Sequence, residues 1–137
     1  MRRRRKSRIL ALGMLYALEM QDDGAADAAR PVFDMYSRRF EKSVEDYALH
    51  LVHGVVAHQR ELDQAIRDQA YNWDFERITP VDRQIMRVAL FELLHDRDTP
   101  AAVCINEAID IAKLYSTSES GHFINGILDA IRKQHGA

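Results

Sequence analysis

Apolar residues recur at helical spacing along nearly the whole of this 137-residue chain, and no other feature limits the fold as much. No segment of four or more residues alternates convincingly between apolar and polar, the pattern that half-buried strands require. The six glycines and three prolines are few, which favours long helices over many turns. The sequence therefore predicts an all-α fold, a compact bundle of six to seven helices, in a single domain over residues 4–137.

Two Thr-Pro pairs, at positions 79–80 and 99–100, give the clearest helix starts. Threonine caps free backbone N–H groups, and proline fits the first helical position. The predicted helices run to about residues 94 and 115. The first of them is apolar nearly all round, which is typical of the buried centre of a bundle.

The other helices are predicted over residues 4–20, 27–38 and 43–69, and in the C-terminal residues beyond a polar loop at 116–121. Ser43 is the expected cap of the third helix, with Asp46 completing a capping box. That segment fits either one long helix or two helices with a break near His58-Gln59, and two are favoured. Asn125-Gly126 is normally a turn signal, but the flanking stripe keeps helical phase across it. The apolar stripe of the first helix runs through Ile9, Leu12, Gly13, Tyr16, Ala17 and Met20.

Charge is divided unevenly along the chain. The formal net charge is -2, from 19 Lys+Arg against 21 Asp+Glu. Residues 1–8 hold six of the positive charges and no acid, so the other 129 residues carry 13 minus 21, or -8. The sequence thus predicts a basic arm over residues 1–8, leading into the first helix of an acidic body. Its basic residues are Arg2, Arg3, Arg4, Arg5, Lys6 and Arg8.

The basic arm can be understood in two ways. A run of like charges is often only a solvated tail. This run joins directly onto an amphipathic helix, however, and places positive charge where the helix dipole disfavours it. Arginine also suits phosphate because its planar fork donates paired hydrogen bonds. The arm is therefore expected to bind nucleic acid as one oriented basic edge.

The six histidines suggest a metal site only weakly. His50 and His53 lie three residues apart but point away from the apolar stripe, and His58 could join them only from another turn. A zinc site needs a third and usually a fourth ligand, so solvated surface residues are expected. Cys104 lies in an apolar helical context and is expected to act as a small buried hydrophobe. With no Gly-rich phosphate loop or nucleophile elbow, the sequence predicts no catalytic residue, no metal and no cofactor.

A membrane location is not expected. No segment reaches the roughly 18 uninterrupted apolar residues that a span needs. The basic, then apolar, N-terminus resembles a signal peptide, but it lacks a cleavage site and continues as an amphipathic helix. The single cysteine fits a reducing cytosol, so a cytoplasmic location is expected.

The polar loop from Ser116 to His122 precedes a helix, where free backbone N–H groups can hold a phosphate or a base edge. On local grounds an ordinary capped loop is about as good an interpretation. The two are left open at this point.

Two long runs resemble the C-terminal half of the NusB family: TPVDRQIMRVALFELL and TPAAVCINEAIDIAKLYSTSESGHFINGILDAI. The start, RRKSR followed by ALGMLYALE, is similar to that family's start. The resemblance covers nearly the whole chain in order and is weakest from Asp22 to Phe75.

The resemblance implies a NusB-like all-helical fold without enzymatic activity. It implies binding to boxA, a short single-stranded RNA signal of ribosomal RNA operons. It further implies action with NusE, a small-subunit ribosomal protein, in loading an antitermination complex onto RNA polymerase.

Residues carried over by position fall in three groups. Arg4, Arg5, Lys6 and Arg8 match the family's RNA-binding arm, and the adjacent Arg2 and Arg3 extend it. The second RNA-contacting region is matched by Glu119, Ser120 and Phe123, and His122, which lies within it, is a further RNA-binding candidate. Less specific matches near RNA and partner surfaces are Asp82, Arg83 and Arg87. Phe123 and Tyr16 are candidates for contacting unstacked bases, although both lie on apolar stripes, which favours a place in the core.

The chain departs from the family pattern at Gly13, where a glutamine is common, and at Gly121 and His122, the second standing where a lysine is common. A missing lysine weakens the electrostatics of that loop. Two other hypotheses remain open: a protein-only helical adaptor whose arm is a nonspecific tail, and a metal-dependent enzyme that uses the histidines. The wide apolar faces of the first and central helices suit a homodimer as well as a core.

Overall fold

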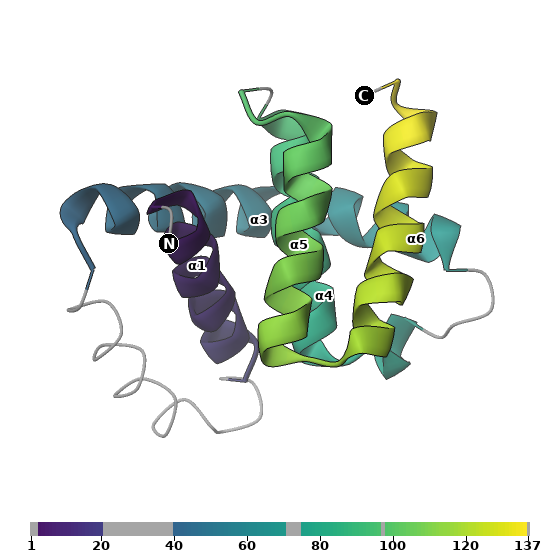
Figure 1. The fold of residues 1–137 in the computed structure, drawn as a ribbon, viewed down its shortest axis with the longest axis horizontal. Coiled ribbons are helices and arrows are strands. Elements are labelled where there is room, and N and C mark those ends of the chain that lie inside the picture. Colours follow the sequence, from purple (N-terminus) through teal and green to yellow (C-terminus); the bar gives the residue numbers. More distant parts are fainter. Residues whose placement is uncertain (1–2, 21–39, 71–74, 97, 137) are drawn as a thin grey trace. The chain divides into compact units, whose positions relative to one another are not determined.

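The computed structural model describes residues 3–20, 40–70, 75–96 and 98–136, and this part of the chain is helical throughout its regular elements (Figure 1). The all-α prediction is confirmed. The elements are α1 (Arg3–Met20), α3 (Lys42–Gln69), the short 3₁₀ helix η2 (Phe75–Arg77), α4 (Pro80–His95), α5 (Ala101–Tyr115) and α6 (Ser118–Gln134). The described residues thus hold five α-helices, fewer than the six or seven expected, and the helix predicted over 27–38 lies outside them.

Helix α3 is one unbroken helix of 28 residues, so the predicted break near His58-Gln59 is wrong. The buried residues Val55 and Leu62 lie seven positions apart, which keeps the apolar stripe in helical phase across the expected break. The cap prediction at Ser43 is also wrong. The helix begins at Lys42 because the carbonyl of Glu41 accepts the first helical hydrogen bonds.

The chain divides into two compact units, residues 1–54 and 55–137. In the first unit, the N-terminal turns of α1 touch the start of α3. The hydroxyl of Ser7 lies 2.9 Å from the carbonyl oxygen of Val44 and 3.1 Å from that of Arg3, and it can donate to either. The buried residues of α1 are Ser7, Arg8, Leu10, Ala11, Leu12 and Leu15.

The buried face of α1 differs from the predicted stripe. Gly13 is exposed, and Tyr16 keeps 39% of its surface exposed. The row of Ser7, Ala11 and Leu15 is buried instead, because small or hydrogen-bonded side chains there allow close packing. Apolar residues occupy more than one row of this helix, so the sequence alone did not settle which row faces inward.

In the second unit, α4 is the central helix, as predicted. Its residues from Gln84 to Leu93 are all buried, and α5 and α6 both pack against it and against each other (Figure 1). Thr79 caps α4 as expected, because its hydroxyl accepts from the backbone N–H of Asp82 at 3.3 Å. Cys104 is buried, at 1% exposure.

The starts of α5 and α6 differ from the sequence-based expectation. Pro100 occupies the cap position of α5, one residue before the helix, and Thr99 lies near Glu92 on α4 with an oxygen–oxygen distance of 3.4 Å. Helix α6 begins at Ser118, so much of the predicted polar loop is helical, and Thr117 is its cap. At the other end of α6, hydrogen bonds from Arg132 and Lys133 lower the pKa of Asp129 below its ordinary value.

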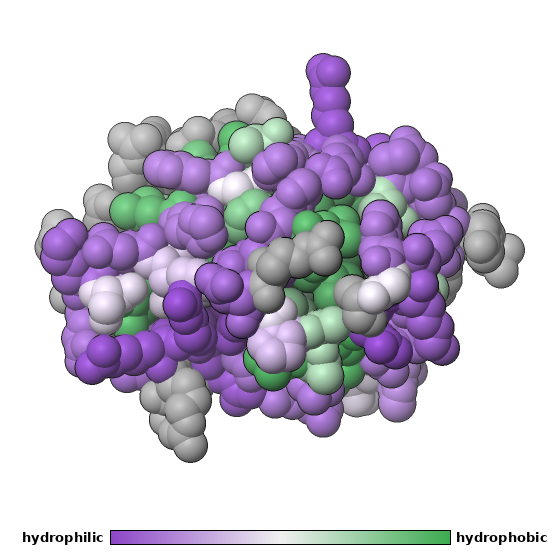
Figure 2. Space-filling view, turned by 90° about the horizontal axis from the view of Figure 1, so that it is seen from above, coloured by the Kyte–Doolittle hydropathy of each residue, from purple (hydrophilic) through white to green (hydrophobic). Residues whose placement is uncertain are grey.

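Hydrophilic side chains cover most of the face in Figure 2, with hydrophobic ones showing between them. Large apolar side chains that are exposed are distributed over three helices: Tyr16, Leu18, Leu49, Val56, Val103, Leu114 and Tyr115. Among the described residues, no helix combines the length and hydropathy that crossing a membrane requires.

Candidate nucleic-acid interface

The basic cluster at the N-terminus is part of α1. The helix begins at Arg3, so the predicted arm is helical from that residue on, and the first turn contains no acidic residue. Arg3, Arg4 and Lys6 are exposed, and we call these three the basic turn. Arg5 is half-buried, and Arg2 lies outside the described residues. The positive end of the helix dipole lies at this turn and adds to the positive potential of the three side chains.

Arg4 stacks on an aromatic ring of α3. Its guanidinium carbon lies 3.5 Å from the centre of the Tyr47 ring, and the centres of the Tyr47 and His50 rings are 5.5 Å apart. A stacked guanidinium is held in place while its in-plane N–H groups stay able to donate to a phosphate. An open hollow of about 510 Å³ beside this stack is lined by Arg3, Arg4, Ser7, Ser43, Asp46, Tyr47 and His50.

Arg8 has a different environment from the basic turn. Only 5% of its surface is exposed, because it lies on the buried side of α1 beside Ser7 and Leu12. The sequence grouped Arg8 with its basic neighbours by proximity along the chain. The structure separates it from the exposed surface that Arg3, Arg4 and Lys6 form.

A second group of candidate residues surrounds the N-terminus of α6. The hydroxyl of Ser120 donates to Oδ2 of Asp82 at 2.8 Å, and the backbone N–H of Ser120 donates to the Thr117 hydroxyl at 3.0 Å. The Ser116 hydroxyl lies 3.0 Å from that of Ser120. We call Asp82, Ser116, Thr117 and Ser120 the cap cluster. It ties the first turn of α4 to the first turn of α6.

The candidate residues on α6 therefore have different environments. Ser120 is engaged in the cap cluster, whereas Glu119 and His122 are exposed and Phe123 is half-buried. Asp82 is 6% exposed, and its Oδ1 has no hydrogen-bond partner among the described residues. Glu119 and His122 are thus the polar candidates that this helix end presents to solvent.

The two arginines of α4 are bound within the second unit. Arg87 donates to both carboxylate oxygens of Asp63 on α3, at 2.7 and 2.9 Å, and both residues are buried. Arg83 donates to the carbonyl oxygen of Ile78 at 3.0 Å, which anchors the segment before α4. These contacts give both arginines a structural role.

Sequence reasoning missed Tyr47 and Asp63. Tyr47 falls on the apolar stripe of α3, a position that favours the core, and no local signal links it to Arg4, which is 43 positions away. Asp63 lies 24 positions from Arg87, and no local signal in the sequence distinguishes it from the other acidic residues. Only the packing of the helices brings these partners together.

Comparison with known proteins gives a consistent result. The model of the NusB family matches residues 5–133. The transcription antitermination protein NusB of Acetivibrio thermocellus is 39% identical over 130 residues, which cover 95% of this chain and 88% of that protein.

Two solved structures have the same fold. T. maritima NusB superposes with a TM-score of 0.83 at 32% sequence identity, covering 98% of this chain and 93% of that one. A chain in a crystal structure of antitermination factors NusB and NusE in complex with double-stranded RNA superposes with a TM-score of 0.79 at 26% identity, covering 98% of both chains.

Proposed function

Since this chain belongs to the NusB family, a family of transcription antitermination factors and not of enzymes, we propose that it binds RNA together with NusE. In its specific form, the proposal is that the RNA is a boxA-type single strand of ribosomal RNA operons. The bound protein then helps to assemble an antitermination complex on RNA polymerase.

The basic turn is the observation that carries the RNA-binding proposal. Arg3, Arg4 and Lys6 project from one helix end of a chain that is otherwise acidic. Such an arrangement favours contact with a phosphate backbone through one oriented edge. The stack of Arg4 on Tyr47 adds rigidity, because it fixes one guanidinium before the RNA arrives.

The start of α6 supplies a weaker set of contacts. Glu119 and His122 are exposed there, and Phe123 offers part of an aromatic face. A histidine where the family commonly has a lysine leaves this region without the permanent positive charge of an ammonium group, and so with less attraction for phosphate. We therefore assign most of the electrostatic attraction to the basic turn, and assign to α6 the contacts with bases.

One experiment can distinguish whether affinity depends on the RNA being single-stranded or on its sequence. Fluorescence anisotropy is measured with a labelled boxA-type single strand, a scrambled strand and the boxA duplex, each with and without NusE. We expect the boxA single strand to bind most tightly and NusE to tighten it further. Equal affinity for all three RNAs would contradict the boxA proposal, and absence of binding to any of them would favour the protein-only adaptor.

The same assay tests the basic end of α1. The Arg4→Ala/Lys6→Ala protein is expected to lose about tenfold or more in affinity, since each basic side chain that contacts a phosphate adds to binding. Arg132→Ala/Lys133→Ala, at the far end of α6, is the matched control with the same change in charge. Circular dichroism checks that both proteins stay helical. Equal losses of RNA affinity in the two variants would mean that the effect comes from net charge and not from the position of the replaced residues.

A further inference from the structure

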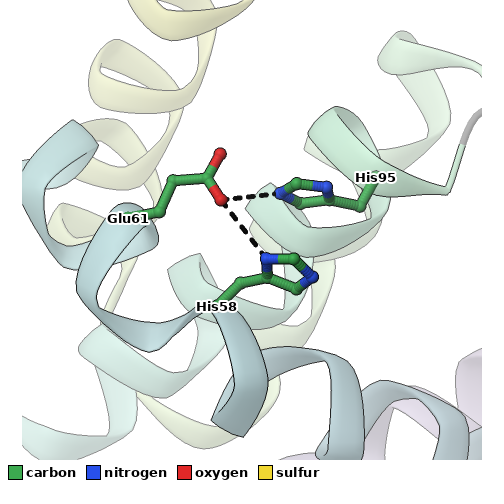
Figure 3. Close-up of side chains that lie close together, drawn as sticks. All are labelled: His58, Glu61 and His95. Atoms are coloured by element: carbon green, nitrogen blue, oxygen red, sulfur yellow. Dashed lines mark hydrogen bonds and ion pairs between the residues drawn. The ribbon is translucent and has the colours of Figure 1, made fainter.

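Two histidines and one glutamate converge on the surface of the second unit (Figure 3). His58 and Glu61 lie one turn apart on α3, and His95 is the last residue of α4. Glu61 Oε1 lies 2.9 Å from Nε2 of His95 and 3.3 Å from Nδ1 of His58. One ligand atom from each of the three residues lies within 4.8 Å of the other two.

The packing of α3 against α4 creates this cluster. The ring of Phe91, one turn before His95, lies 6.0 Å from the His58 ring and 5.9 Å from the His95 ring. Phe91 is buried and forms an apolar base beneath the two histidines. The histidine side chains are only partly exposed, at 39% for His58 and 28% for His95, so they are held in place and still reached by water.

The spacing of the ligand atoms suits a tetrahedral metal ion. Bonds of about 2.0–2.2 Å to nitrogen and carboxylate oxygen place neighbouring ligand atoms about 3.4 Å apart. The distances of 2.9 and 3.3 Å from the two histidine nitrogens to Glu61 Oε1 are close to that value. Both nitrogens already lie against one carboxylate oxygen, so the three ligand atoms are close enough together to share one ion once the rings are oriented toward it.

We propose that His58, Glu61 and His95 bind a divalent transition-metal ion of the zinc type. Nδ1 of His58, Nε2 of His95 and the Glu61 carboxylate supply three ligands, and water completes the shell. Two imidazoles with one carboxylate select zinc, cobalt, nickel or copper over magnesium and calcium, which prefer oxygen ligands. The position of His95 in the last turn of α4 also favours a cation, because the helix dipole is negative there.

Metal binding requires the two rings to turn. The imidazoles stack with centroids 3.9 Å apart and planes inclined by 19°. A metal ion binds in the plane of each imidazole, so two parallel rings cannot both reach it. Partial exposure leaves the side chains room to rotate about their terminal bond. Loss of the stack on metal binding is therefore a specific expectation of the site.

Arg60 lowers the affinity of the site. It lines the same open hollow as His58 and Glu61 on α3, and its positive charge opposes a cation. Arg60→Ala is thus expected to raise metal affinity, because it removes a positive charge beside the ligands.

The test uses the full chain with Zn²⁺ in calorimetry and Co²⁺ in visible absorption. We expect one ion per chain and the intense cobalt bands of a tetrahedral site. Nuclear magnetic resonance should show both imidazoles shifting as the stack opens. His95→Ala and Glu61→Gln should each weaken binding by about tenfold or more, since removing even an outer contact of a metal site costs 10- to 100-fold.

His50→Ala/His53→Ala is the matched control, because these histidines are also three residues apart on α3 and exposed. It should bind Zn²⁺ as the unmodified protein does. The thermal midpoints of all variants without metal confirm that each is folded. The proposal is overturned by absence of binding, by equal affinity in all variants, or by a loss confined to His50→Ala/His53→Ala.

Discussion

Arg87 and Asp63 form a buried ion pair between α4 and α3. The guanidinium donates to both carboxylate oxygens, and the exposed fractions of the two side chains are only 6% and 10%. Withdrawing two charges from water costs free energy that the paired hydrogen bonds recover. Removing either residue would leave the other as a buried charge without an ion-pair partner, which lowers the stability of the fold.

Asp63→Ala is therefore expected to lower the free energy of unfolding by about 3–5 kcal/mol, because Arg87 stays buried without its carboxylate. The double variant Asp63→Leu/Arg87→Met should recover much of that loss by replacing both charges with apolar side chains. Urea denaturation measures all three proteins. A loss of less than about 1 kcal/mol in Asp63→Ala would mean that the pair behaves as a surface salt bridge.

At the scale of residues, the sequence identified the chemistry of the basic cluster but not the environment of each member. Arg3 and Arg4 are exposed as expected, whereas Arg8 and Arg87 are buried. Burial depends on the row that a helix turns inward, and α1 has apolar residues on several rows. The partners of Arg4 and Arg87 come from distant positions, which periodicity within one helix does not reveal.

At the scale of elements, the cap cluster joins the starts of α4 and α6. The Asp82 carboxylate is buried, and the Ser120 hydroxyl is the hydrogen-bond donor to its Oδ2. The same serine gives its backbone N–H to Thr117, the cap of α6. A single residue therefore supports both the capping of one helix and the burial of a charge on another.

Ser120→Ala should destabilise the protein by about 1–3 kcal/mol, because it removes a hydrogen bond from a buried carboxylate. Ser118→Ala is the matched control, since Ser118 is exposed in the same turn. Thermal and urea unfolding of the two variants give the comparison. Similar stability of both would show that water replaces the lost donor.

Helix boundaries were harder to predict than helix existence. Thr79 was correctly identified as a cap because its signal stands alone before an apolar helix. At Ser43 and Thr99 the same kind of signal lies one or two residues from the true start, because the backbone carbonyls of Glu41 and Pro100 accept the first helical hydrogen bonds. Helix α3 continues through His58 because its buried stripe stays in phase, and tertiary packing outweighs weak local breaks.

At the scale of the whole molecule, charge is separated along the chain. Residues 1–8 carry six positive charges, and the other 129 residues carry 13 minus 21, or -8. An acidic body repels RNA, so nonspecific attraction elsewhere on the chain is weak. Binding through the basic turn alone should release few counterions. The slope of log affinity against log salt concentration should therefore be small and should reflect the number of phosphate contacts.

Replacing Arg3, Arg4 and Lys6 together with alanine is expected to reduce the salt dependence of RNA binding. For single strands, the slope of log affinity against log salt changes by about 0.7 for each phosphate contact, so loss of all three contacts should reduce it by about 2. Anisotropy titrations at four or five salt concentrations measure the slope for this variant and for Arg132→Ala/Lys133→Ala. An unchanged slope with weaker binding would mean that the basic turn acts by shaping the α1 surface rather than by neutralising phosphates. A slope reduced in both variants in proportion to the charges removed, three and two, would assign the effect to net charge, because the two sets of residues lie at opposite ends of the sequence.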